Sequence, residues 1–197
     1  MLSLQPRGFS LIELLIGLVV LGIVMMIGMP SLATWIQNTQ IRNQAEAVYS
    51  GLQMARAEAL RRNTQVRFQL FNTLNAGCAA STSGKSWVVS LADPSGQCNL
   101  APADTAPQII QKKDGAEGSP NTALTATGGS LVTFNGLGRV VNVGPLTQVN
   151  ITNPVGGACK TAAGNEPMRC LRIQVASGGQ MRMCDPAVTA GTDPRRC

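Results

Sequence analysis

Near its N-terminus the chain reads GFSLIELLIGLVVLGIVMMIGM, residues 8–29, and this stretch decides the architecture. Glu13 is the one charged residue between Phe9 and Trp35, and residues 14–29 are only Leu, Ile, Val, Met and Gly. A run of about 20 apolar residues is long enough to cross the hydrocarbon core of a bilayer. The sequence therefore predicts a transmembrane helix over residues 9–30.

Two simpler explanations of this stretch each leave something unexplained. A secretory signal peptide cleaved after Ala33 would have an apolar region longer than the usual ~7–15 residues. A plain membrane anchor would not account for Glu13, because a carboxylate in the bilayer costs on the order of 2.5–3.5 kcal/mol. A third explanation concerns Glu13 alone, since the helix dipole favours an acid in the first helical turn.

The motif Gly8-Phe9-Ser10-Leu11-Ile12-Glu13-Leu14-Leu15 resembles the class III signal of type IV pilins and type II secretion pseudopilins. The resemblance implies that residues 1–8 are a leader peptide, which an inner-membrane prepilin peptidase removes by cutting between Gly8 and Phe9. It also implies N-methylation of the new amino terminus at Phe9. Glu13 would then neutralise the amine of a neighbouring subunit during filament assembly, because a desolvated charge pair disfavours wrong registers.

We expect the helix to run from Phe9 to about Arg62, well beyond the membrane. Six apolar residues recur at spacings of three and four, which makes one stripe on a helix: Ile41, Ala45, Val48, Leu52, Ala55 and Ala59. Residues 31–63 are therefore predicted to be an amphipathic continuation that packs on a globular head. Gly28 and Pro30 disfavour a helix interior, and related pilins lose helicity near such a proline in the filament. These two residues form either a hinge or a static kink.

Residues 64–197 are expected to form a β-rich head, because short apolar runs there are separated by turn residues. The expected strands are 64–71, 86–91, 130–134, 139–143, 149–152, 171–175 and 180–183. The turns at 135–138 and 176–179 predict two hairpins, and the expected long loops are 72–85, 93–107 and 114–129. A helix followed by strands predicts the α+β class, with one antiparallel sheet or a pair of sheets.

Two further segments resemble the GspH/FimT family of minor pilins and pseudopilins. They are residues 134–140, at the central hairpin, and residues 55–63, at the end of the predicted helix. The resemblance implies a type IV pilin-like fold, in which a long N-terminal transmembrane and amphipathic helix packs on an antiparallel β-sheet head.

All six cysteines follow the predicted helix, and their even number predicts up to three disulfides in a head outside the cytoplasm. They are Cys78, Cys98, Cys159, Cys170, Cys184 and Cys197. Six cysteines allow fifteen pairings, and we expect the sequential one, in which each bond closes a local loop. Closing a loop of about 15 residues is worth roughly 3 kcal/mol in the chain-entropy model. Zinc binding is not expected, because the sequence has neither a Cys-x2-Cys pair nor a His.

The composition argues against an enzyme. The 197 residues include 16 Lys and Arg, 10 Asp and Glu, and no His. The missing His excludes a His-based catalytic triad, a His metal ligand and an imidazole pH switch. The sequence also contains no phosphate-binding loop, dinucleotide motif or diagnostic pair of carboxylates. We therefore expect no catalytic residues, no cofactor and no metal.

Most of the net charge of +6 lies near the C-terminus, since the chain from Arg139 onward has seven basic and three acidic residues, a net +4. Phosphates attract arginine without sequence preference, so five arginines are candidate DNA-binding residues: Arg169, Arg172, Arg182, Arg195 and Arg196. Some minor pilins of the family bind DNA through a Gly-Arg-x-Arg motif. The similar stretch here, residues 179–182, has Gln180 in place of the first arginine. The alternative is a solvated basic rim or a contact to a neighbouring subunit.

Together these patterns predict a minor pilin or pseudopilin that takes part in initiating or capping the assembly of a type IV pilus-like filament. The expected partners are other minor pilins and the major pilin, through the N-terminal helix, with an inner-membrane assembly platform and the prepilin peptidase. The protein would cross the bacterial inner membrane once, with a periplasmic head, and would lie in the filament or at its tip after assembly.

Two alternatives remain open at this point. One is a type II secretion pseudopilin H, which supports protein export. The other belongs to a different class, a DNA-binding minor pilin that acts as a receptor in natural transformation.

Overall fold

The structure is a computed structural model that describes residues 9–197, apart from the side chains of residues 27–31. The expected leader, residues 1–8 with Gly8, lies outside the described residues. The chain divides into two compact units, residues 1–36 and residues 37–197. The first unit contains the N-terminal part of a long helix, and the second contains the rest of the helix and all the strands.

Helix α1 (Leu11–Arg62) begins directly after Ser10. The backbone N–H of Glu13 donates a hydrogen bond to Oγ of Ser10 at 3.3 Å, which is the bond that an N-cap serine accepts from the third helical residue. The apolar side chains from Leu11 to Met26 are exposed. Within the described part of the chain, no helical stretch is both long enough and apolar enough to cross a membrane.

The helix continues without interruption through Gly28 and Pro30, although both residue types disfavour a helix interior. These two positions are described only by their helical backbone. The hinge expected there stays a prediction.

From Gln37 onward α1 turns one apolar face toward the core of the head. The predicted stripe is confirmed, because each of its six residues is completely buried: Ile41, Ala45, Val48, Leu52, Ala55 and Ala59. Gly51 lets the helix approach the first sheet closely, since a Cβ there would lie 2.9 Å from Phe68 and 3.0 Å from Trp87. The centroids of these two rings are 5.6 Å apart, and both rings are among the largest buried side chains of the head.

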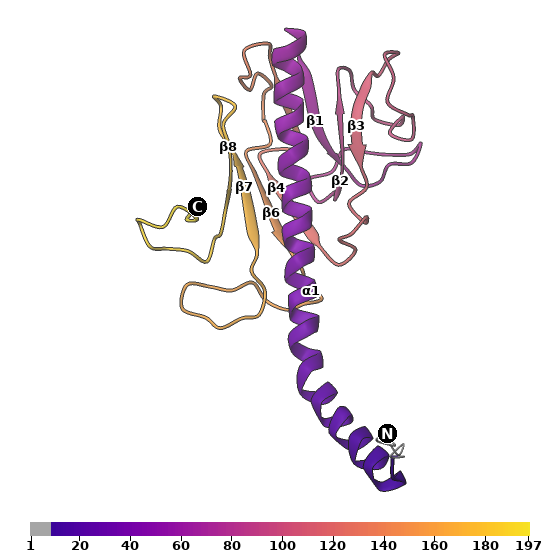
Figure 1. The fold of residues 1–197 in the computed structure, drawn as a ribbon. Helices are drawn as coiled ribbons and strands as arrows, with labels where there is room; N and C mark the ends of the chain where they lie inside the picture. The colour runs from indigo at the N-terminus through magenta and orange to yellow at the C-terminus, as the bar shows by residue number, and fades with distance from the viewer. Residues whose placement is uncertain (1–8) are drawn as a thin grey trace, which may run out of the picture. The chain divides into compact units, whose positions relative to one another are not determined.

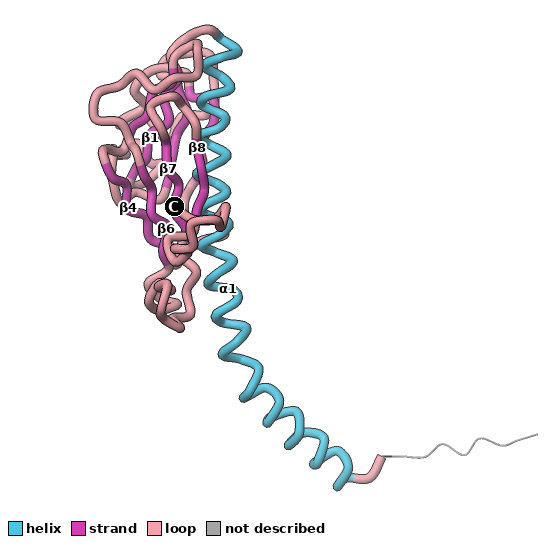
Figure 2. Tube along the Cα trace, turned by 90° about the vertical axis from the view of Figure 1, so that its left-hand side faces the viewer, coloured by secondary structure: helices cyan, strands magenta, loops and turns pink. Residues whose placement is uncertain are grey.

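Two four-stranded antiparallel sheets form the rest of the head (Figure 1). The first sheet has the order β3 (Ile109–Lys113), β2 (Ser86–Ser90), β1 (Val66–Phe71) and β5 (Leu131–Phe134). The second has the order β4 (Ala123–Thr127), β6 (Gln148–Thr152), β7 (Leu171–Val175) and β8 (Met181–Cys184). One core cluster joins the buried face of α1 to both sheets, and the strands lie on one side of this part of α1 (Figure 2). The fold is α+β, as predicted.

The sequence does not predict two of the strands. β4 lies inside segment 114–129, and the prediction of a loop is wrong for residues 123–127. Its sequence, Ala-Leu-Thr-Ala-Thr, shows no clear apolar alternation, and only Leu124 of this strand is fully buried. β3 is an edge strand of sequence Ile-Ile-Gln-Lys-Lys. Its last three residues are polar or charged, so it shows no alternation of apolar and polar residues.

The strand predicted at 139–143 does not form, and this prediction is wrong. An isolated bridge between Phe134 and Val140 is all that remains of the expected hairpin ladder. Beyond it, the side chain of Asn142 takes the place of a second strand. Its Oδ1 accepts the N–H of Thr133 at 2.8 Å, and its Nδ2 donates to the carbonyl of Leu131 at 3.1 Å. The side chain of Asn142 thus bonds backbone groups at the edge of β5, although residues 139–143 do not form a strand.

Candidate functional site

The expected processing signal lies at the start of α1, in the first unit. Phe9 precedes the helix, and its side chain is 84% exposed. Ser10 and Glu13 occupy the serine and glutamate positions of a capping box, with Glu13 third in the helix. The Glu13 side chain is exposed and has no partner within residues 9–197. The cleavage, the methylation and the role of Glu13 stay predictions, and Gly8 itself lies outside the described residues.

Three disulfide bonds close loops of the head, and they use all six cysteines. The bonds join Cys78 to Cys98, Cys159 to Cys170 and Cys184 to Cys197, with Cα atoms 6.1, 5.4 and 5.1 Å apart. This is the sequential pairing. The first bond belongs to a small second core with Phe71, Val88 and Ile109. Within residues 9–197, no group of three or more His, Cys, Asp or Glu side chains is placed to hold a metal ion.

The last disulfide folds the C-terminal loop, residues 185–197, back along strand β8. The N–H of Asp185 donates to the carbonyl of Arg195 at 2.8 Å, and Asp185 also forms an isolated parallel bridge with Arg196. Arg182 of β8 donates from Nη2 to the carbonyl of Pro194, at 3.0 Å, and to the carbonyl of Arg196. The guanidinium of Arg182 therefore holds the C-terminal loop to the strand.

Two more of the candidate arginines have partners within the head. Arg195 forms an ion pair with Asp193, with 2.8 Å between Nη2 and Oδ2, and hydrogen bonds from Arg195 lower the pKa of Asp193 to about 2. Arg172 of β7 donates from Nε to Oδ1 of Asn150 on β6 at 2.7 Å. Both guanidinium groups are thus engaged before any ligand arrives.

The remaining two candidates, Arg169 and Arg196, have exposed side chains without a partner among the described residues. The backbone N–H of Arg169 donates to Oδ1 of Asn38 on α1 at 2.7 Å, whereas Arg196 belongs to the C-terminal loop. The structure therefore leaves two of the five candidate guanidinium groups unpaired.

A set of amide side chains, which no motif in the sequence marks, ties the head to α1. We call Gln37, Asn38, Gln44 and Asn153 the amide clamp. Asn153 is fully buried, and its Nδ2 donates to the carbonyl and side-chain oxygens of Gln37. Asn38 donates to the carbonyl of Pro167, and Gln44 to that of Lys85, each at 3.0 Å. No sequence signal marks these amides. Gln37, Asn38 and Gln44 are polar residues at helical spacing from the apolar stripe, and Asn153 lies in the loop after β6.

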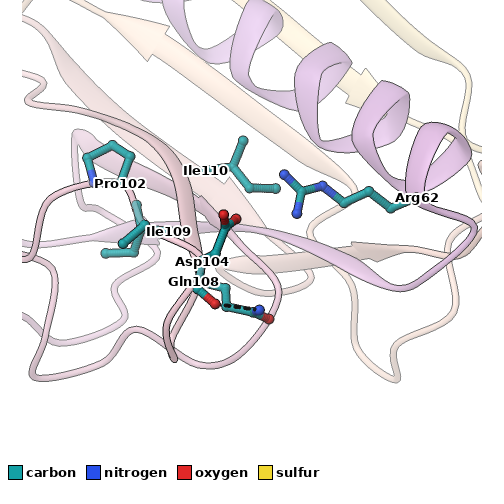
Figure 3. Close-up of a pocket in the computed structure, with 7 residues that line it drawn as sticks. Arg62, Pro102, Asp104, Gln108, Ile109 and Ile110 are labelled. Atoms are coloured by element: carbon teal, nitrogen blue, oxygen red, sulfur yellow. Dashed lines mark hydrogen bonds between the residues drawn. The ribbon is translucent and has the colours of Figure 1, made fainter.

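A pocket of about 260 Å³ lies where α1 ends and β3 begins (Figure 3). It is lined by Arg62, Pro102, Ala103, Asp104, Gln108, Ile109 and Ile110. The sequence does not mark this site, because residues 102–107 fall in an expected loop and carry no recognised motif.

Comparisons with known proteins give matches over most of the chain. The family model described as "Type II transport protein GspH" matches residues 44–184, and the model of the prokaryotic N-terminal methylation motif matches residues 5–29. Two crystal structures of the type IV minor pilin FimU from Pseudomonas aeruginosa are similar, each with a TM-score of 0.47. One is 18% identical and the match covers 79% of this chain and 98% of that chain. The other is 17% identical, with 83% and 98% covered. No curated protein matches the chain.

The GspH model reaches from the second half of α1 through both sheets to the last residue of β8. This match and the methylation motif support a minor pilin or pseudopilin role in the assembly of a type IV pilus-like filament. Because the family model covers well over half of the sequence, the chain belongs to the family of the type II transport protein GspH.

Proposed function

We propose that this protein is a minor pilin, which residues 9–30 anchor in the bacterial inner membrane and which takes part in initiating or capping the assembly of a type IV pilus-like filament. The start of α1 is the observation that carries the proposal. There Phe9, Ser10 and Glu13 follow the order of a prepilin signal, inside the segment that the methylation motif matches. The same helix carries the head. The role is structural rather than catalytic.

The chemistry of this helix start supports a pairing between subunits. Cleavage by the prepilin peptidase would create a charged α-amine on Phe9, next to the Ser10 cap. The carboxylate of Glu13 has no partner within the described chain, and an unpaired carboxylate among apolar side chains is costly in lipid. Pairing it with the amine of an adjacent subunit would favour one register of the packed helices over others. Other minor pilins and the major pilin would be the neighbours, and an inner-membrane platform would assemble them.

The disulfide bonds of the head support a location outside the cytoplasm. Disulfides persist in oxidising compartments such as the bacterial periplasm, and here three of them close loops of the head. The amide clamp attaches α1 to the loops from Gln37 onward, so the folded head begins at the first residues of the second unit. Such a head suits display in the periplasm before assembly, and in the filament or at its tip afterwards.

The intact mass of the full-length gene product, purified from the membranes of its host, tests the proposal. We expect a mature chain that begins at Phe9 and carries one added methyl group. A strain without prepilin peptidase is the control, and there the chain should still begin at Met1. A mature protein that keeps Met1, or that begins at Thr34, would overturn the pilin assignment.

A type II secretion pseudopilin H is the second candidate, and the description of the matched family as a type II transport protein favours it. A deletion strain separates the two roles when surface pili and exported proteins are both measured. Loss of pili with normal export supports the pilus role, whereas loss of export with normal pili supports the secretion role. Restoration by the full chain is the control.

A receptor for DNA in natural transformation is the candidate of another class, and it rests on the exposed guanidinium groups of Arg169 and Arg196. The full-length protein in detergent can be titrated with duplex DNA at two salt concentrations, because phosphate binding weakens steeply with salt. A receptor should lose affinity in the Arg169→Ala, Arg196→Ala double variant. If no salt-sensitive binding is found, this candidate is removed.

A further inference from the structure

The pocket at the end of α1 has charged groups of opposite sign and an apolar side. Arg62 is the last residue of α1, and Asp104 lies in the loop that leads into β3. Figure 3 shows their side chains reaching toward the same space, with Ile110 beside them. Pro102 adds to the apolar part of the lining, whereas the side chain of Ile109 is buried in the second core.

Both charged groups keep bonding capacity for a ligand. Arg62 donates from Nε to Oε2 of Glu58 at 2.7 Å, and its terminal nitrogens have no further bond to a described residue. The carboxylate of Asp104 is exposed and accepts no hydrogen bond within residues 9–197. The side chain of Gln108 donates a hydrogen bond to the backbone carbonyl of Asp104 and not to its carboxylate. A donor and an acceptor therefore stand on different parts of the same pocket wall.

The pocket lies next to an open sheet edge. β3 is the outermost strand of its sheet and pairs only with β2. The register shifts between Val89 and Ser90, so that Ile110 is an extra residue, a β-bulge. On the outer side of β3, the one backbone bond to another described segment goes from the N–H of Ala103 to the carbonyl of Ile109, at 3.2 Å. The rest of this edge is free to pair with an extended chain.

The loop at residues 102–108, which lines the pocket, is held in one conformation. Gln108 has a φ of 55°, which a residue other than glycine rarely adopts, and such backbone is found preferentially at functional sites. Two hydrogen bonds hold it, from its N–H to the carbonyl of Thr105 at 2.7 Å and from its Nε2 to the carbonyl of Asp104 at 2.9 Å. Asp104 is therefore presented by a preorganised loop.

We propose that this pocket binds an extended polypeptide segment with an apolar side chain. A lone anion would be repelled by Asp104 and a lone cation by Arg62, whereas a peptide group is neutral and carries one donor and one acceptor. A peptide carbonyl accepts from the guanidinium of Arg62, and a peptide N–H donates to the carboxylate of Asp104. The volume is below the ~300–1,000 Å³ of sites for drug-sized ligands, which suits the side chain of a single residue against Ile110.

This binding site is independent of the role proposed for the N-terminal signal, because all of its residues belong to the head. Addition of a strand to a free edge, with a pocket for one side chain, is an established mode of peptide recognition. Failure of one proposal therefore leaves the other unaffected.

The test uses the full-length protein in detergent micelles, labelled with 15N, and the probe N-acetyl-leucine N-methylamide. This probe has one apolar side chain between two peptide groups. We expect saturable changes of the amide shifts at residues 104–106 and 108–110, with weak, millimolar affinity. Asp104→Ala should weaken binding about tenfold, as expected for a lost hydrogen bond to a charged group. Glu46→Ala is the matched control, because Glu46 is an exposed acid of α1 outside the pocket and away from β3.

Three results would refute the peptide site. The first is the absence of saturable shifts, and the second is unchanged binding by Asp104→Ala in a protein whose other amide signals show that it is folded. The third is tighter binding of acetate or methylguanidinium than of the capped leucine, because the pocket would then select a lone charge.

Discussion

Gly138 and Gly179 meet backbone to backbone, where the turn after β5 packs on the turn between β7 and β8. A Cβ placed on Gly179 would overlap the carbonyl oxygen of Gly138. Both glycines have a positive φ, 72° and 80° respectively, in the region that L side chains rarely adopt. Beside them, the N–H of Val140 donates to the carbonyl of Ser177 at 3.1 Å. This contact joins a turn of the first sheet to a hairpin of the second.

We expect Gly179→Ala to lower the free energy of unfolding by about 3 kcal/mol, because the methyl group meets backbone in addition to the unfavourable φ. Gly118→Ala is the matched control. Gly118 has a φ of 75°, but a Cβ there would meet no heavy atom within 4 Å, so its cost should be the conformational ~1 kcal/mol alone. Denaturant unfolding of the full-length protein with its disulfides intact measures both, and equal losses would contradict the contact.

Gly51 offers a second test of close packing, this time between α1 and the first sheet. Alanine is favoured over glycine in a helix by about 1 kcal/mol, so the substitution would be stabilising at a solvent-exposed helix position. Here the new Cβ would lie 2.9 Å from Phe68 and 3.0 Å from Trp87, and overpacking costs typically ~1–3 kcal/mol. We expect Gly51→Ala to be net destabilising in the same unfolding assay, and the exposed neighbour Ser50→Ala to be close to neutral. A gain in stability from Gly51→Ala would disprove the tight contact.

The buried face of α1 and the central strands could be predicted because their residues repeat with the period of the element. Ile41 to Ala59 follow helical spacing, and all six predicted residues are buried. β4 and the segment 139–143 could not be predicted in this way. At β4 only Leu124 is fully buried, and at 139–143 the side chain of Asn142 supplies the bonds that a strand would have made. Hydrogen bonds from a side chain such as Asn142 to the edge of a strand leave no periodic pattern in the sequence.

The candidate sites show the same limit. The sequence locates the basic residues near the C-terminus, but it does not show that the guanidinium of Arg182 is bonded to the carbonyls of Pro194 and Arg196. Carbonyl acceptors are present at every residue, so no composition reveals which of them an arginine will meet. The pocket at Arg62 and Asp104 was missed for a related reason, since the two residues are brought together only by the path of the loop that leads into β3.

Arg182→Ala should release the C-terminal loop while the disulfide keeps it attached. Two backbone carbonyls lose a charged donor, and the cost is about 1 kcal/mol or less because the guanidinium is exposed. We expect faster amide hydrogen exchange over residues 185–197 and little change in the strands of the first sheet. Arg196→Ala is the matched control, because its exposed side chain has no partner in the described chain. Equal exchange in the two variants would show that Arg182 does not hold the loop.

Glu58 should give the head an acid-sensitive part of its stability. Its Oε2 lies 2.7 Å from Nη2 of Arg61 and 2.7 Å from Nε of Arg62, and hydrogen bonds from Arg61 and then Arg62 lower the pKa of Glu58 from 4.5 to about 2. Between these two values the unfolded chain binds more protons than the folded chain. The stabilisation by Glu58 is therefore complete above the unfolded pKa and is lost as the pH falls through the folded pKa.

We expect the free energy of unfolding to be lower at about pH 3 than at about pH 6, with a smaller difference in Glu58→Gln, which does not ionise. The arginine beside Asp193 also lowers the pKa of that carboxyl to about 2, and its contribution is common to both proteins, so the comparison isolates Glu58. Glu46→Gln is the control, since Glu46 is an exposed acid of α1 paired with Arg42. If Glu58→Gln keeps the full pH dependence of the unsubstituted protein, the paired arginines do not stabilise the end of α1 through this carboxylate.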